Sequence, residues 1–233
     1  MLKPCRKSPF AIGGVSVDSK SVESKGTAKE VILGRIREIM QGAPEAEPIA
    51  RDYIRTSDHD AAARMDLFTE RLVDYGADVH HVSPKEIAKK AAELCEARGV
   101  ESLVVPTDVP QDWLPEVEVR PDEGLGRGVL ESTGGVMTGC TLAIAQTGTI
   151  VLDGGERQGR RVITLLPDFH ICVVFAEQIA GIVPEAVSRL ESSAKRPLTF
   201  VSGPSATSDI ELSRVEGVHG PRSLAVLVVK GAT

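Results

Sequence analysis

A glycine-rich segment that ends in two adjacent arginines, residues 153–161, has the residue types best suited to binding an anion. It reads Asp-Gly-Gly-Glu-Arg-Gln-Gly-Arg-Arg and follows a short apolar run. Glycines let backbone N–H groups approach an anion closely, and paired arginines clamp a carboxylate or a phosphate. We therefore predict ligand contacts from Gly154, Gly155, Arg160 and Arg161; the alternative is a surface loop with solvated arginines. The spacing matches neither a nucleotide P-loop nor the dinucleotide-binding glycine fingerprint.

A second candidate segment is Gln-Thr-Gly-Thr at residues 146–149, between two apolar runs. A glycine between two hydroxyl residues at a strand end can present N–H and O–H donors, so we predict ligand contacts from Thr147, Gly148 and Thr149. The same residues also suit a tight hairpin in which Gly148 takes a positive φ. The two interpretations are compatible.

A third candidate is the hydroxyl-rich stretch of residues 202–211, Ser-Gly-Pro-Ser-Ala-Thr-Ser-Asp-Ile-Glu. A predicted strand ends there and a helical turn follows, and the N–H groups at the start of a helix attract anions. We predict that Ser205 contacts the ligand. The alternative is ordinary helix capping by Ser208 or Asp209.

Proton carriers are predicted near the same place. His219 lies in the loop Gly-Val-His-Gly-Pro just before the last apolar run, and Asp209 and Glu211 belong to the hydroxyl-rich stretch. These three residues are the candidates for orienting a ligand or moving protons. His170 opens another predicted strand, although a lone histidine is more often a structural hydrogen-bonding partner.

Several chemistries lack the residues that they require. The four cysteines lie far apart, which favours buried thiols over a zinc or iron–sulfur site, and no cluster of metal ligands is evident. No flavin or nicotinamide signature is present either. We therefore expect no cofactor in this chain, and any electron acceptor would have to come from other subunits.

Composition narrows the function further. The net charge of -6 argues against non-specific nucleic-acid binding, and an aromatic content of 3% argues against base stacking. No apolar run is long enough to span a bilayer, and no signal-peptide core follows the basic first residues. We expect a cytoplasmic protein with a core of Val, Leu, Ile and Ala.

The elements that must position these residues follow an α/β pattern. Residues 1–26 are predicted to be a mobile tail, residues 27–76 a helical extension packed on the main domain, and residues 77–233 an α/β domain. A capping box at residues 83–86 starts a helix between strands at 77–82 and 102–105, a βαβ unit. Further strands are predicted at 117–119, 141–146, 149–152, 162–166, 170–175, 198–201 and 224–229, with a helix at 184–190 and a turn or short helix at 209–212.

The motifs together resemble the LUD domain of the lactate utilization protein C (LutC/YkgG) family. The similarity rests on residues 138–155, on Gln-Gly-Arg-Arg at 158–161, and on Leu-Pro-Asp-Phe-His-Ile-Cys-Val-Val at 166–174. Residues 202–211 and 217–222 extend it, so that it covers roughly residues 28–230. Gln146 stands where the family usually has Glu, so a carboxylate is missing there.

This resemblance implies a Rossmann-like sheet of the NagB/RpiA/CoA-transferase type. It also implies a role in oxidising L-lactate to pyruvate together with iron–sulfur partner proteins. From the glycine, arginine and hydroxyl segments above, we expect this chain to be a non-redox subunit or ligand-binding partner that binds a small anionic ligand. Two alternatives remain at this point. The chain could be a stand-alone enzyme acting on a phosphosugar, a CoA ester or a folate with nucleotide, or an assembly factor without a small ligand.

Overall fold

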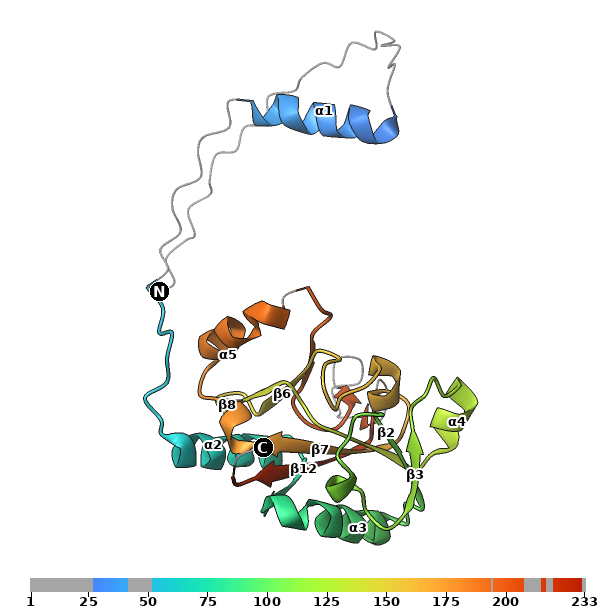
Figure 1. Ribbon diagram of the computed structural model, residues 1–233. Coiled ribbons are helices and arrows are strands. Elements are labelled where there is room, and N and C mark those ends of the chain that lie inside the picture. Colours follow the sequence, from blue (N-terminus) through green and yellow to red (C-terminus); the bar gives the residue numbers. More distant parts are fainter. Residues whose placement is uncertain (1–26, 42–51, 194, 208–214, 217–219, 232–233) are drawn as a thin grey trace, which may run out of the picture. The chain divides into compact units, whose positions relative to one another are not determined.

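The computed structural model describes residues 27–41, 52–193, 195–207, 215–216 and 220–231 of the chain (Figure 1). These residues form two units, Met1–Arg51 and Asp52–Thr233. In the first unit, helix α1 (Ala28–Met40) begins after Thr27, whose side chain forms a capping box with that of Glu30. None of the residues of α1 is buried.

The second unit is built on a six-stranded sheet in which every neighbouring pair of strands is parallel. This arrangement confirms the predicted α/β class. Both faces of the sheet are covered, which explains why its inner strands are continuous apolar runs. In spatial order the strands are β1 (Asp78–Val82), β12 (Ser223–Val229), β7 (Phe169–Phe175), β4 (Gly135–Thr138), β2 (Ser102–Val105) and β3 (Glu118–Pro121).

A second, smaller sheet packs over one face of the first. Its order is β8 (Ile179–Ala180), β5 (Leu142–Ile144), β6 (Thr149–Leu152) and β9 (Thr199–Val201). Side chains of β7 and β12 alternate between the two faces: Val174 and Val226 pack with the smaller sheet, and Val173 and Leu227 pack with helix α3 (Ile87–Arg98). In Figure 1, α3 accordingly lies below β7 and β12, and β6 lies above them.

Helix α2 (Ala61–Asp74), which the sequence analysis grouped with the extension, belongs to the unit that starts at Asp52. Its fully buried Phe68 and Leu72 join the core beneath the smaller sheet. The remaining helices are α4 (Arg127–Ser132) and α5 (Val183–Arg189), with 3-10 turns η1 (Pro84–Glu86), η2 (Gln111–Trp113), η3 (Arg161–Thr164), η4 (Ala176–Gln178) and η5 (Leu190–Ser193) and the short strand pair β10 (Ala206–Thr207) and β11 (Val215–Glu216). None of the helices in the described part of the chain has the length and apolarity needed to cross a membrane.

Two local predictions need correction. The strand predicted at residues 162–166 is wrong, because this stretch forms the 3-10 turn η3, in which the fully buried Ile163 fits a core cluster with Val104 and Val136. The strands β1 and β2 are parallel and flank α3 as predicted, yet they are not neighbours, because β12, β7 and β4 lie between them. The turn predicted at residues 209–212 lies outside the described residues.

Candidate functional site

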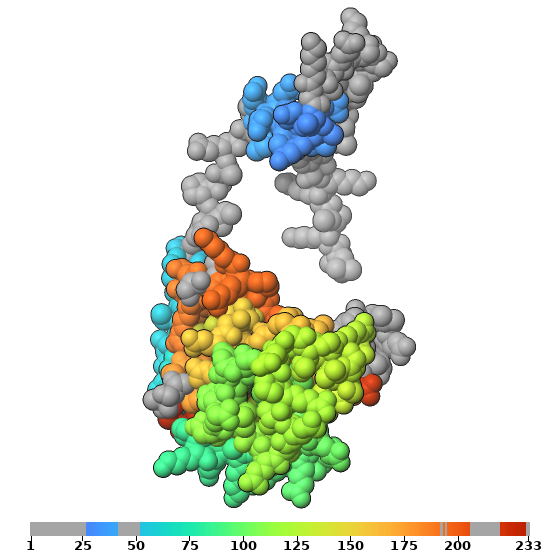
Figure 2. All heavy atoms as spheres, turned by 45° about the vertical axis from the view of Figure 1, so that its right-hand side comes forward, coloured from blue at the N-terminus to red at the C-terminus, as the bar shows by residue number. Residues whose placement is uncertain are grey.

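Two cavities lie side by side along η3. The larger has a volume of about 620 Å³ and the smaller about 220 Å³, and both are lined by Arg161, Thr164 and Thr199. The larger cavity opens beyond the carboxyl ends of β2 and β3, where Asp108 and Asp122 line it. The smaller cavity lies at the amino ends of β7 and β12. In Figure 2, the segment that carries β6 and η3 (yellow) lies between the green surface of β2 to α4 and the orange surface of α5.

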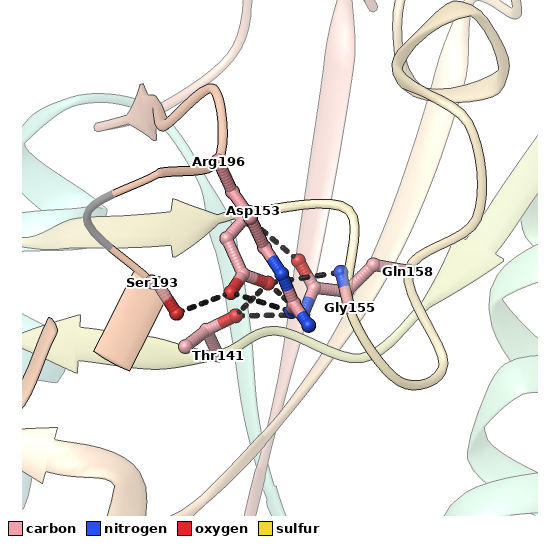
Figure 3. Close-up of polar contacts among 6 residues, drawn as sticks. All are labelled: Thr141, Asp153, Gly155, Gln158, Ser193 and Arg196. Atoms are coloured by element: carbon pink, nitrogen blue, oxygen red, sulfur yellow. Dashed lines mark hydrogen bonds and ion pairs between the residues drawn. The ribbon is translucent and has the colours of Figure 1, made fainter.

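The glycine-rich loop after β6 is held from inside by the buried carboxylate of Asp153 (Figure 3). Ser193 Oγ donates to Oδ2 over 2.6 Å, and Thr141 Oγ1 donates to Oδ1 over 2.5 Å. The Gly155 N–H and Gln158 Nε2 also donate to Oδ1, at 2.9 and 3.1 Å, and the Arg196 guanidinium lies 3.2 Å from Oδ2. Asp153 therefore joins the loop to the residue before β5, to the end of η5 and to the segment that follows η5.

This network keeps Asp153 ionised. Burial by itself would raise the pKa of its carboxyl, but the hydrogen bonds from Ser193, Thr141, Gly155 and Gln158 outweigh burial and lower the pKa to about 2. Gly155 is needed here for space, because a Cβ at this position would lie 2.7 Å from Asp153 Oδ1. The loop wall of the larger cavity is thus fixed by interactions that a ligand does not supply.

Arg157 fixes the outer turn of the same loop. It is the one non-glycine residue with a positive φ (60°) in the described ranges, and its N–H donates to Asp108 Oδ2 over 2.7 Å. Its carbonyl accepts from the Gly139 N–H over 2.7 Å, and its guanidinium lies over the Trp113 ring. Sequence reasoning missed Asp108 and Arg157, because their contact spans 49 positions of the chain.

The two predicted clamp arginines have different environments. Arg160 Nε donates to Asp122 Oδ2 over 2.8 Å, Nη2 donates to Oδ1 over 2.5 Å, and Nη2 also donates to the Leu125 carbonyl over 3.0 Å. The Asp122 side chain is only 2% exposed, and its ion pair with Arg160 is the main reason that its pKa is lowered. Arg160 lines the larger cavity, but its charge is already balanced by Asp122.

Arg161 has no such partner among the described residues. Its Nη1 donates to Thr164 Oγ1 over 2.8 Å, and no carboxylate of the described chain lies within ion-pair distance. Partial burial lowers the pKa of the guanidinium, which nonetheless stays protonated at neutral pH. A cation that borders two cavities and has no carboxylate partner among the residues that the structure describes is the strongest feature for anion binding in this region.

The Gln146–Thr149 segment lines neither cavity. It is the hairpin between β5 and β6, and the positive φ predicted for Gly148 is confirmed at 57°. Thr149 Oγ1 bonds Thr147 Oγ1 at 2.7 Å and Ser202 Oγ at 2.8 Å, so these hydroxyls connect the hairpin to the end of β9. A ligand role for Thr147, Gly148 and Thr149 stays a prediction.

The structure brings the other predicted residues to the cavities. Gly154, Gly155, Arg160 and Arg161 line the larger one, and Arg161 shares the smaller one with Ser205 and with Ser202 from the hydroxyl-rich stretch. Asp209, Glu211 and His219 lie outside the described residues.

His170 lines the smaller cavity, although it is only 2% exposed. Its Nε2 lies 2.8 Å from Oγ1 of the fully buried Thr138 on β4. Burial, together with the nearby positive charge of Arg161, lowers the pKa of His170 to about 4. The imidazole is therefore neutral at physiological pH.

Among the residues that the structure describes, no group of three or more His, Cys, Asp or Glu side chains is placed to hold a metal ion. Cys95, Cys140 and Cys172 are free and buried. Burial raises the pKa of the Cys95 thiol to about 11, so it is unreactive at neutral pH.

Comparisons with known proteins agree with these observations. A family model described as the LUD domain matches residues 127–229. Lactate utilization protein C from Deinococcus radiodurans is 44% identical over 215 residues, which cover 90% of this chain and 99% of that protein. Lactate utilization protein C from Halalkalibacterium halodurans is 25% identical over 190 residues, covering 74% and 82%.

A solved structure shows the same fold. The crystal structure of a DUF162 family protein from D. radiodurans superposes with a TM-score of 0.64 at 38% sequence identity, covering 74% of this chain and 99% of that one. The smaller cavity and most of the lining of the larger one lie within the residues 127–229 that match the LUD-domain model. The chain belongs to the LUD-domain family of lactate utilization protein C.

Proposed function

We propose that this chain is a component of lactate utilization that binds a small carboxylate at Arg161. The names of its relatives support the process, and the Arg161 guanidinium, which lines both cavities, supports the ligand class. Electrons from lactate would pass to iron–sulfur proteins acting with this chain. The observation that carries the binding proposal is that Arg161, unlike Arg160, has no carboxylate partner in the described part of the chain.

Size favours the smaller cavity for a C3 acid. Lactate and pyruvate have six heavy atoms, which fill at most about 180 Å³ at the roughly 30 Å³ that one water molecule takes up in the liquid. The smaller cavity offers about 220 Å³. Its lining also supplies the hydrogen-bonding groups that a short acid needs, including Ser202, Ser205 and His170.

Calorimetric titration of the full-length chain with lactate and pyruvate tests this proposal. Arg161→Gln removes the charge and keeps an amide, and should weaken binding of both acids at least tenfold, since charge-assisted hydrogen bonds are about twice as strong as neutral ones. Arg127→Gln is the matched control, because Arg127 is 79% exposed on α4 and lines neither cavity. Equal affinities of Arg161→Gln and wild type would refute the site.

The larger cavity keeps a second candidate function open. Its volume of about 620 Å³ exceeds what a six-atom acid requires and suits a larger substrate such as a phosphosugar. Turnover of such a substrate by the isolated chain would select the stand-alone enzyme. Co-purification with iron–sulfur proteins, together with an inert isolated chain, would select the subunit.

A further inference from the structure

The pair formed by Thr138 and His170 shows which hydrogen-bonding group the smaller cavity presents beside Arg161. Thr138 ends β4 and His170 lies near the start of the adjacent strand β7. Both side chains are buried, and 2.8 Å separates Oγ1 from Nε2. Either atom could be the donor on distance alone, so the remaining partners decide the direction of the bond.

If His170 donated its Nε2 hydrogen to Thr138, the hydroxyl hydrogen of Thr138 would need an acceptor of its own. In the described ranges, His170 Nε2 is the one side-chain or backbone atom that is hydrogen-bonded to Thr138 Oγ1. A buried hydroxyl hydrogen without an acceptor costs about 1–3 kcal/mol. The arrangement that avoids this cost has Thr138 donating and Nε2 accepting.

The neutral imidazole then carries its single hydrogen on Nδ1. This nitrogen has no hydrogen-bond partner within the part of the chain that the structure describes. Although it has no partner among these residues, Nδ1 is not fully buried. Because His170 lines the smaller cavity and Thr138 does not, the free N–H is available to a ligand there.

Two donors that accept nothing thus border one small cavity, the guanidinium of Arg161 and the Nδ1–H of His170. We infer that the smaller cavity is a 2-oxo-acid site, in which Arg161 binds the carboxylate and His170 Nδ1–H donates to the keto oxygen. This inference rests on the proposed carboxylate site and adds its specificity. A 2-oxo acid offers acceptor oxygens on adjacent carbons, matching the two donors.

A 2-hydroxy acid fits the same donors less well. Its hydroxyl oxygen can accept the Nδ1 hydrogen, but its own hydrogen then needs an acceptor, and neither Arg161 nor His170 provides one. A hydroxyl of the lining would have to accept that hydrogen, and Ser202 is already bonded to Thr149 while Ser205 also has a partner of its own. We therefore expect pyruvate, the product of lactate oxidation, to bind about three- to tenfold more tightly than lactate.

The test compares pyruvate with lactate by calorimetry on the full-length chain and on two variants of Thr138. Thr138→Val keeps the shape but removes the hydroxyl donor, which frees His170 to move its hydrogen to Nε2, so the preference for pyruvate should fall toward one. Thr138→Ser restores the donor and should restore the preference. A merely structural role for Thr138 would change both affinities together and leave their ratio unchanged.

Nitrogen-15 NMR of the histidine rings gives an independent readout, because the neutral imidazole shifts distinguish a hydrogen on Nδ1 from one on Nε2. A wild-type His170 with its hydrogen on Nε2 would overturn the inference. Equal binding of lactate and pyruvate, both weakened by Arg161→Gln, would also overturn it while leaving the carboxylate site intact. Failure of both acids to bind the wild type would refute the proposed function itself.

Discussion

Acid should destabilise the folded chain in two separate pH ranges, and the first range belongs to His170. Its pKa is about 4 in the folded chain, because burial and the charge of Arg161 disfavour the imidazolium, whereas the ordinary value is 6.5. As the pH falls below 6.5, the His170 imidazole becomes protonated in the unfolded chain but stays neutral in the folded chain. Stability is therefore lost between pH 6.5 and about 4.

The size of this loss follows from the two pKa values. The gap between 6.5 and about 4 corresponds to a limit of about 3.4 kcal/mol, at 1.36 kcal/mol for each pH unit. At pH 5 the unfolded imidazole is almost fully protonated and the folded one is mostly neutral, so about 2 kcal/mol of this limit is already lost. Because His170 is only 2% exposed, solvent screening does not reduce this figure much.

Urea unfolding of wild type and His170→Gln at pH values of about 7.5, 6 and 5 measures this contribution. The wild type should lose about 2 kcal/mol more than the variant over this range, since glutamine does not titrate. His59→Gln is the control, because His59 lies in the exposed segment before α2 and lines neither cavity. Parallel curves for wild type and His170→Gln would show that His170 is not held neutral by burial.

The remaining predictions concern the loop and the hairpin. The second acid range belongs to Asp153, whose pKa of about 2 lies below the ordinary 3.8, so its stabilisation is present above pH 3.8 and is lost as the pH falls toward 2. Asp153→Asn should lower the free energy of unfolding at neutral pH by about 2–3 kcal/mol, measured in urea, and should also weaken ligand binding because the loop loses its internal support. Gly148→Ala should cost about 1–2 kcal/mol in the same assay, because φ is 57° and the new Cβ would lie 2.7 Å from Arg71 Cβ. A stable Gly148→Ala variant would contradict the hairpin geometry.

Local sequence patterns predicted the elements better than their arrangement. The strands at 102–105 and 149–152 match β2 and β6, because these apolar runs are bounded by turn residues and both are fully buried. The run at 162–166 failed, because a short apolar segment fits a buried turn as well as a strand. The position of β12 between β1 and β7 depends on pairing across about 150 residues, which no local pattern encodes.

For the candidate site, too, local patterns predicted the segment but not the contacts between residues that are distant in the chain. Glycine and arginine composition was enough to find the loop at 153–161, which lines the larger cavity. It was not enough to separate Arg160 from Arg161, because the partner of Arg160 lies 38 positions earlier in the chain, after β3. The role of Thr138 could not be predicted for the same reason, since its hydrogen-bond partner His170 lies 32 positions later in the chain.

The separation of the two arginines explains how one loop serves both structure and binding. Arg160 contacts the loop after β3 through Asp122, so it fixes the start of η3 and leaves Arg161, the next residue, at the boundary of the two cavities. A second unpaired cation beside Arg161 would repel it, and the Asp122 carboxylate removes that repulsion. Asp153 holds the other end of the same loop. The loop that carries Arg161 is therefore held at both ends by buried carboxylates that do not touch the proposed ligand. This support fixes the guanidinium before the ligand binds, which is the preorganisation that a small carboxylate requires for measurable affinity.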